Sequence, residues 1–221
     1  MTTLARLLAP LARAGDPPLP DTTIVRRLGG DCRLALTYRW SRSEPILPWI
    51  MLNPAYAGTR TAFDLTARRV MRFSWRWGFG GAVLLNLVPF IAPRTADLRN
   101  WLRWHERDDW AARDQLWANH DALRDELTPH DAAMAAWGTT WNAWSTAEAY
   151  ACDLLLEQAF DAINATDGPR TALLRTFCLG MTAGRRPLHP MARGRCRAPD
   201  ATQPIPFPHH PGTIVGLEAA A

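Results

Sequence analysis

Four short apolar runs constrain the fold of this 221-residue chain more than any other feature. Each run ends at a loop that contains Pro, Gly or Asn; the runs are 46–52, 82–88, 132–137 and 173–179. Apolar runs of this length between turn signals are typical of strands buried on both faces. Patterns with helical spacing separate them, at 64–77, 97–127 and 146–165. This alternation predicts an α/β fold: a three-layer sandwich around a central, mostly parallel four-stranded sheet.

The ends of the chain differ in composition from this central part. We predict a flexible N-terminal arm at 1–23, one domain at 24–200 and a C-terminal tail at 201–221, with a further strand at 33–40. No apolar run approaches the ~20 residues of a membrane span. The first residues carry arginines within their apolar face, unlike a signal peptide. We therefore expect a cytoplasmic protein with no membrane partner, and no obligatory protein partner is evident.

All 25 basic residues are Arg, and the chain contains no Lys. This excludes a Walker lysine, a Schiff-base lysine and a lysine general base. The charge is unevenly distributed: 46–96 carries six Arg and one Asp, 97–167 five Arg and fourteen acids, and 168–199 seven Arg and no acid. If the two basic stretches meet in space, they form a surface suited to a polyanion; otherwise the surface is mixed.

The cysteines and histidines give no metal signature. Cys32, Cys152, Cys178 and Cys196 are far apart and form no C-x-x-C pair. Reduced thiols are the simplest interpretation, and a four-cysteine iron–sulfur site is the alternative. The six His do not add a zinc pattern. We expect neither a metal nor a cofactor.

Polar residues follow the ends of the predicted strands, where the active sites of such sheets lie. Asn53 and Asn86 end the first two runs, 137–140 ends the third, and His189 lies in the loop after the fourth. The common nucleophile-elbow, zinc-protease and dinucleotide-binding patterns are absent from the sequence. These polar strand ends are the candidate site.

The chain resembles a widespread bacterial family of uncharacterised proteins over roughly residues 30–200. The matching segments agree in order and spacing; they are 50–54, 64–69, 77–81, 86–87, 94–97 and 184–190. The order of its strand-end motifs is also similar to that of the uracil-DNA glycosylase superfamily. This resemblance implies a fold like that of uracil-DNA glycosylase and DNA as the partner.

The superfamily resemblance implies roles for single residues. Asn53 would position the attacking water, Asn86 would recognise the edge of the base, and His189 would act at the leaving group. Tyr56 departs by one position from the tyrosine of the uracil motif, and 191–193 replaces the usual serine and proline. A base other than uracil is therefore the predicted substrate.

The residue types fit this chemistry without a metal. Cleavage of an N-glycosidic bond passes through an oxocarbenium-like state and needs a held water and donors aimed at the base. Asn is a poor base, so Asp64, eleven residues after Asn53, is the nearest carboxylate that could help; the alternative is a helix N-cap. Trp141 and Trp144 are candidate stacking surfaces for a flipped base, although most tryptophans belong to the core.

The arginines complete the hypothesis. We assign DNA contacts to five of them: Arg69, Arg94, Arg193, Arg195 and Arg197. The last three could instead belong to a solvated tail, and the candidate asparagines and His189 could instead be structural residues of loops. The predicted function is a monofunctional DNA glycosylase that releases a modified base, such as a bulky base of phage DNA, in antiviral defence. The alternatives are a non-catalytic nucleic-acid-binding protein of the same fold, or a nucleoside or nucleotide hydrolase.

Overall fold

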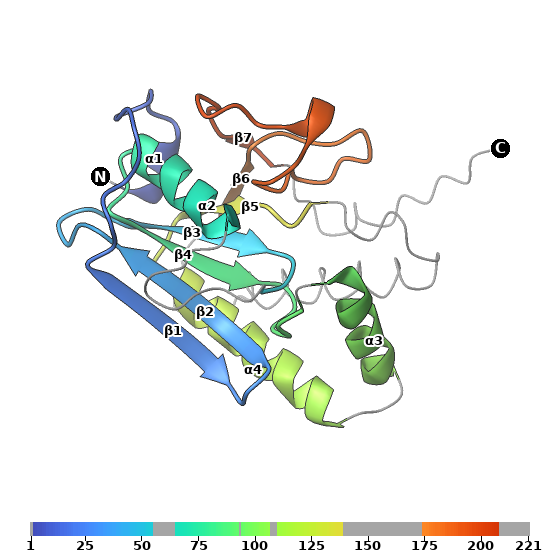
Figure 1. Cartoon of the computed structure of the whole chain (residues 1–221). Helices are drawn as coiled ribbons and strands as arrows, with labels where there is room; N and C mark the ends of the chain where they lie inside the picture. The colour runs from blue at the N-terminus through green and yellow to red at the C-terminus, as the bar shows by residue number, and fades with distance from the viewer. Residues whose placement is uncertain (1, 55–64, 93, 107–109, 139–173, 208–221) are drawn as a thin grey trace.

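The computed structural model describes residues 2–54, 65–92, 94–106, 110–138 and 174–207 (Figure 1). They build one mixed seven-stranded sheet in the order β1-β2-β4-β3-β5-β6-β7. The strands are β1 (Thr22–Leu28), β2 (Cys32–Arg39), β3 (Ile46–Met51), β4 (Gly81–Asn86), β5 (Ala132–Ala135), β6 (Arg175–Cys178) and β7 (Ile205–Pro206). The neighbours β4, β3, β5 and β6 run parallel, whereas β1, β2 and β7 pair antiparallel. The α/β class and the parallel centre are confirmed.

The predicted number of four strands is wrong, because antiparallel strands extend the sheet at both sides. The four apolar runs form the parallel centre, and the strand predicted at 33–40 is β2. β1 gives little signal in the sequence, since most of its residues are exposed or half-buried. β7 has only two residues, and one of them is a proline. Edge strands of this kind carry no buried apolar run.

Helices cover both faces of the sheet. They are α1 (Thr3–Leu7), α2 (Leu65–Arg76), α3 (Thr95–Glu106) and α4 (Trp110–Leu127), with a short 3-10 turn, η2, at Gly194–Cys196. Figure 1 shows α2 on one face and α4 on the opposite face. The helix predicted at 64–77 is confirmed as α2, and the pattern at 97–127 is two helices. The helix predicted at 146–165 lies outside the described residues.

Alternate side chains of each central strand belong to two separate cores. In β3, Trp49 packs with α1 and α2, and its neighbour Ile50 packs with α3 and α4. Trp49 stacks on Trp77 with ring centroids 5.8 Å apart, and its Nε1 donates to Oγ of Ser74 at 3.0 Å. Ser74 in turn donates to the carbonyl of Val70 at 2.9 Å. These contacts fix β3 against α2, and with it the strand end that carries the candidate site.

Described residues of the predicted N-terminal arm and of the predicted C-terminal tail pack on the domain. Leu7 of α1 is buried, and Ala12 N–H donates to the carbonyl of Arg76 at 2.8 Å. At the other end, Ile205 pairs with Cys178, so the sheet extends past the boundary predicted at residue 200. The first part of the predicted arm therefore contacts the domain, and two residues of the predicted tail, Ile205 and Pro206, form a strand. None of the described helices is long and apolar enough to cross a membrane.

Candidate functional site

Three adjacent parallel strands bring polar residues to one edge of the sheet. Asn86 ends β4 and pairs with Met51, the last residue of β3. Asn53 follows two residues later, and Gly138 follows β5. Leu87 N–H donates to the carbonyl of Met51 at 3.0 Å, which continues the pairing beyond the strands. The carboxyl ends of β4, β3 and β5 therefore meet here, as the sequence predicts.

The amide of Asn53 is fixed by its own loop. Its Nδ2 donates to the carbonyl of Ala92 at 2.9 Å and to the carbonyl of Pro54 at 3.1 Å. Both amide protons are thereby used, and Oδ1 is the remaining hydrogen-bonding atom of the side chain, an acceptor. Asn53 is half-buried. An acceptor held in this way can orient a water molecule.

Asn86 carries a buried donor without a partner among the described residues. The residue is 1% exposed, and its Nδ2 makes no hydrogen bond to any residue of 2–54, 65–92, 94–106, 110–138 or 174–207. An unsatisfied buried donor of this kind typically destabilises the fold by about 1–3 kcal/mol, and few occur in native proteins. A ligand that offers an acceptor at this edge would satisfy it.

Asn119 of α4, the helix layer on one face of the sheet, holds the end of β4. The sequence did not lead us to predict this residue. Its Nδ2 donates to the carbonyls of Asn86 at 2.9 Å and Leu87 at 3.2 Å, while its buried Oδ1 has no partner among the described residues. The signal was present: Asn119 lies three residues after Leu116 and four before Leu123, in the buried stripe of the helix. A polar residue in such a stripe needs a buried partner.

His189 lies directly against the end of β5. Gly138 has a φ of +76°, and a Cβ added there would be 3.1 Å from the Cβ of His189. Gly138 N–H also donates to the carbonyl of Pro187 at 3.1 Å. The main-chain N–H of Met191 donates to Nδ1 of His189 at 3.1 Å. In the neutral ring the proton is therefore on Nε2, which makes that nitrogen a donor.

The predicted DNA-binding arginines fall into two groups. Arg69 is engaged within the chain: it donates to the carbonyls of Pro190 and Ala198 and forms an ion pair with Asp200 at 2.8 Å. These bonds hold the segment after His189 against α2, so Arg69 has a structural task and we leave it out of the proposed interface. Arg94 is exposed and forms an ion pair with Asp97 at 2.9 Å, which lowers the pKa of that carboxyl.

Arg193, Arg195 and Arg197 remain available to a partner. All three are exposed around η2, and no ion pair joins them to another described residue. The orange segment that carries them in Figure 1 lies on the same side of the sheet as α2. Four other candidates, Tyr56, Asp64, Trp141 and Trp144, lie outside the described residues.

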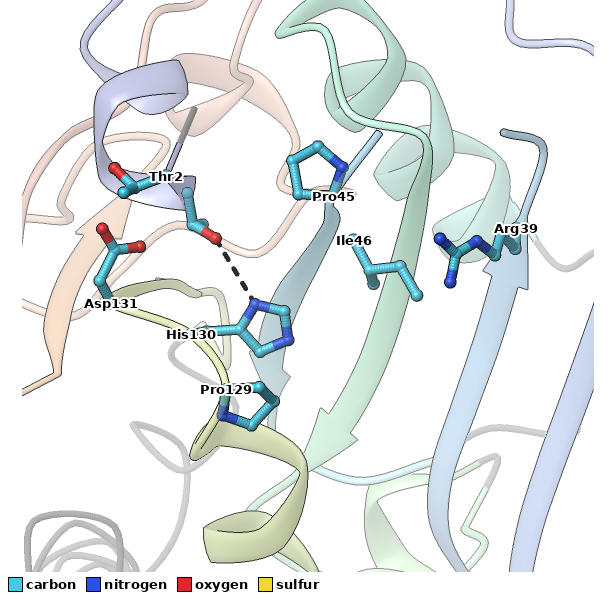
Figure 2. Close-up of a pocket in the computed structure, with 8 residues that line it drawn as sticks. Thr2, Arg39, Pro45, Ile46, Pro129, His130 and Asp131 are labelled. Atoms are coloured by element: carbon cyan, nitrogen blue, oxygen red, sulfur yellow. Dashed lines mark hydrogen bonds between the residues drawn. The ribbon is translucent and has the colours of Figure 1, made fainter. Parts of the chain in front are cut away.

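A separate pocket opens at the opposite edge of the sheet. It has a volume of about 460 Å³ and includes Arg39, Ile46, His130 and Asp131. Figure 2 shows Arg39 and His130 on opposite sides of it, with His130 joined to Thr3. Ile46 and His130 lie where β3 and β5 begin, so a strand length of about 20 Å separates this pocket from the candidate site.

Cysteines and metal ligands do not contribute to the site in the part of the chain described here. Cys32, Cys178 and Cys196 are free thiols, and Cys152 lies outside the described residues. Burial, with a smaller effect of Asp31, raises the pKa of Cys32 to about 11, which makes it a poor nucleophile. Among the described residues, no group of three His, Cys, Asp or Glu is arranged to hold a metal ion.

The fold and the site define an α/β protein with a polar site at the carboxyl ends of its parallel strands. The chain belongs to the family described as "Protein of unknown function (DUF1643)", whose model matches residues 33–191. The matched stretch contains Asn53, Asn86, Asn119 and His189. No curated protein and no solved structure matches the chain.

Proposed function

We propose that this protein is a monofunctional DNA glycosylase, which hydrolyses the N-glycosidic bond of a flipped base and leaves an abasic site. One observation carries the proposal: a fixed acceptor on Asn53, an unsatisfied donor on Asn86 and a donor on His189 come to one edge of the sheet. These are the groups that a metal-free hydrolysis of this bond requires.

Each group has a task in the reaction. Oδ1 of Asn53 accepts a hydrogen bond from water and directs the water oxygen at C1′ of the sugar. The bond from C1′ to the base breaks as the bond to water forms, and one water proton finally resides on the released base. Nε2–H of His189 donates to the departing base and stabilises its developing negative charge.

Asn86 recognises the base. Its Nδ2 would find its missing partner in a carbonyl oxygen or ring nitrogen of the flipped base. Formation of that bond removes the unfavourable burial of a free donor, so a base without an acceptor at this position would be rejected. The departures from the uracil motif favour a modified base, such as a bulky base of phage DNA, and hence a role in defence.

The exposed arginines around η2 would bind the phosphates of DNA. Arg193, Arg195 and Arg197 present three planar guanidinium groups, which suit bidentate phosphate contacts. They lie a few residues after His189 in the chain. Simultaneous replacement of Arg193 and Arg195 by Ala should reduce the salt dependence of DNA binding by about one unit of slope per lost contact.

The test is incubation of the purified protein with DNA duplexes and single strands that carry different normal and modified bases. Alkaline treatment then cleaves the strand at abasic sites. The proposal predicts cleavage at one class of modified base. DNA binding that depends on salt but yields no abasic site would favour the non-catalytic binding protein. Absence of salt-dependent DNA binding, together with release of bases from free nucleosides, would favour the nucleoside hydrolase.

A further inference from the structure

A tight hairpin connects β6 to the loop of His189. Met181 and Pro187 form an antiparallel bridge at its base. Thr182 N–H donates to the carbonyl of Arg186 at 2.9 Å, and Arg185 N–H donates to the carbonyl of Thr182 at 2.9 Å. We call residues 181–187 the arginine hairpin. Its hydrogen bonds define a three-residue loop with a fixed shape.

Arg185 occupies the strained position of this loop. Its φ is +57°, and it is the non-glycine residue with a positive φ in the described part of the chain. Three-residue hairpin loops usually place Gly at the left-handed position. Here the glycine, Gly184, stands one residue earlier, and an arginine holds the left-handed backbone. Strain of this kind is typical of positions where the side chain has a function.

The Arg185 side chain is exposed, and no carboxylate of a described residue forms an ion pair with it. Its immediate surroundings in the sequence are also basic, since residues 168–199 contain no acid. An uncompensated guanidinium on a rigid turn is suited to a fixed anionic group.

The base of the hairpin is fastened to the candidate site. Leu188 N–H donates to the carbonyl of Gly180 at 2.8 Å, and Gly138 N–H donates to the carbonyl of Pro187 at 3.1 Å. Gly138 in turn borders His189. Arg185 and His189 are four positions apart in the chain, so their Cα atoms are at most about 14 Å apart.

We propose that the arginine hairpin is a DNA-contacting arm in which Arg185 binds a backbone phosphate beside the flipped nucleotide. The inference rests on the proposed function for the identity of the polyanion. One DNA strand carries one charge per about 3.4 Å of helix axis. The contacted phosphate therefore lies within about four nucleotides of the target base, and the contact orders the DNA relative to His189.

The test is a titration of labelled duplex DNA, monitored by fluorescence anisotropy at several salt concentrations. The variants are Arg185→Gly, Arg185→Gln and Arg185→Lys, with Arg175→Gln as the matched control. Arg175 is also exposed, but it begins β6 and so lies at the opposite edge of the sheet. Arg185→Gly and Arg185→Gln should weaken binding and reduce the slope of log K against log salt by about 0.9. Arg185→Lys and Arg175→Gln should keep the slope.

Thermal unfolding separates the charge from the shape of the turn. Arg185→Gly relaxes the left-handed backbone, so its Tm should equal or exceed that of the wild type while its DNA affinity falls. A hairpin that served only as a structural turn would bind DNA as well with Gly as with Arg. An unchanged salt slope in both Arg185→Gly and Arg185→Gln would overturn the inference.

DNA with a single neutral methylphosphonate locates the contact. One position within about four nucleotides of the target base should weaken binding of the wild type but not of Arg185→Gly. If no position has this effect, the arm is not a phosphate contact. Base release is measured in parallel. If the wild type releases the base but the Arg185 variants keep its salt slope, the arm alone is rejected. If the Arg185 variants have a smaller salt slope but the wild type releases no base, the glycosylase alone is rejected. A wild type without salt-dependent DNA affinity rejects both.

Discussion

Nδ2 of Asn119 donates to the main-chain oxygen of Asn86 at 2.9 Å, so a side chain from α4 holds the last residue of β4. The two asparagines are equally buried, but their amides differ. Nδ2 of Asn119 donates to two carbonyls, and Nδ2 of Asn86 has no partner in the part of the chain that the structure describes. The Asn119 amide positions the strand, and the Asn86 amide is the group that our proposal assigns to the ligand.

Replacement of each asparagine by leucine, which has the same number and branching of side-chain heavy atoms, should have different effects on stability. Asn119→Leu removes the donor that two carbonyls share, and the free energy of unfolding should fall by about 2–4 kcal/mol. Asn86→Leu removes a donor without a partner, so the Tm should stay or rise while base release falls by about 10²-fold. Chemical unfolding and the abasic-site assay measure the two quantities. A large loss of stability in Asn86→Leu would show that its amide has a structural partner.

Gly138→Ala should displace His189. The added Cβ needs a left-handed backbone and would lie 3.1 Å from the Cβ of His189. We expect a loss of stability of about 1–2 kcal/mol from the backbone alone, together with reduced base release. Gly29→Ala is the matched control, because Gly29 has a φ of +64° but open space around it.

Thermal unfolding should show a loss of stability in both alanine variants, at least as large in Gly138→Ala as in Gly29→Ala because of the added contact with His189. Only Gly138→Ala should lose activity per folded molecule. Equal activity in both variants would mean that contact with Gly138 does not position His189 for the reaction.

His120 should make the protein less stable in mild acid. Burial lowers its pKa below the ordinary value of 6.5, although Asp121 acts in the opposite direction. Below pH 6.5 the unfolded chain binds a proton that the folded chain resists, so the free energy of unfolding falls with pH until the folded pKa is reached. Tm values at pH 7.5 and 5.5 should therefore differ less in His120→Leu than in the wild type. If the Tm difference between pH 7.5 and 5.5 is the same in both proteins, His120 does not cause the loss of stability in acid.

The central part of the fold is visible in the sequence because buried strands leave apolar runs. The runs at 46–52 and 82–88 predict β3 and β4, and the polar residues at their ends, Asn53 directly after the first run and Asn86 near the end of the second, are predicted to lie at one edge of the sheet. The strand-end position follows from local sequence alone, since parallel neighbours must end at one edge.

Long-range contacts are the part that the sequence does not reveal. Arg69 looks like a phosphate ligand from its charge, but the fold places Asp200 and the carbonyl of Pro190, more than 120 residues away, on its guanidinium. β7 is found only by its pairing with β6, because two residues carry no periodic pattern. Charge and hydrophobic periodicity indicate whether a residue is exposed and in which kind of element it lies. They do not indicate which residues distant in the sequence it contacts.

The protein should stop at the abasic site. Strand cleavage by a lyase requires an amine that forms an imine with the sugar, and the chain contains no Lys. With the N-terminal amine blocked, borohydride reduction should trap no covalent complex with DNA. A trapped complex would require another nucleophile and would contradict the monofunctional mechanism.

The rate of abasic-site formation by Asn53→Ala tests the central claim most directly. Asn53 positions water in our account, so folded Asn53→Ala should bind DNA nearly as well as the wild type and lose base release by about 10²–10³-fold. Loss of its hydrogen bonds to the carbonyls of Ala92 and Pro54 should lower the free energy of unfolding by only about 1–2 kcal/mol. Asp64→Asn, measured beside it, shows whether a carboxylate shares the task. Full base release by folded Asn53→Ala protein would contradict the mechanism.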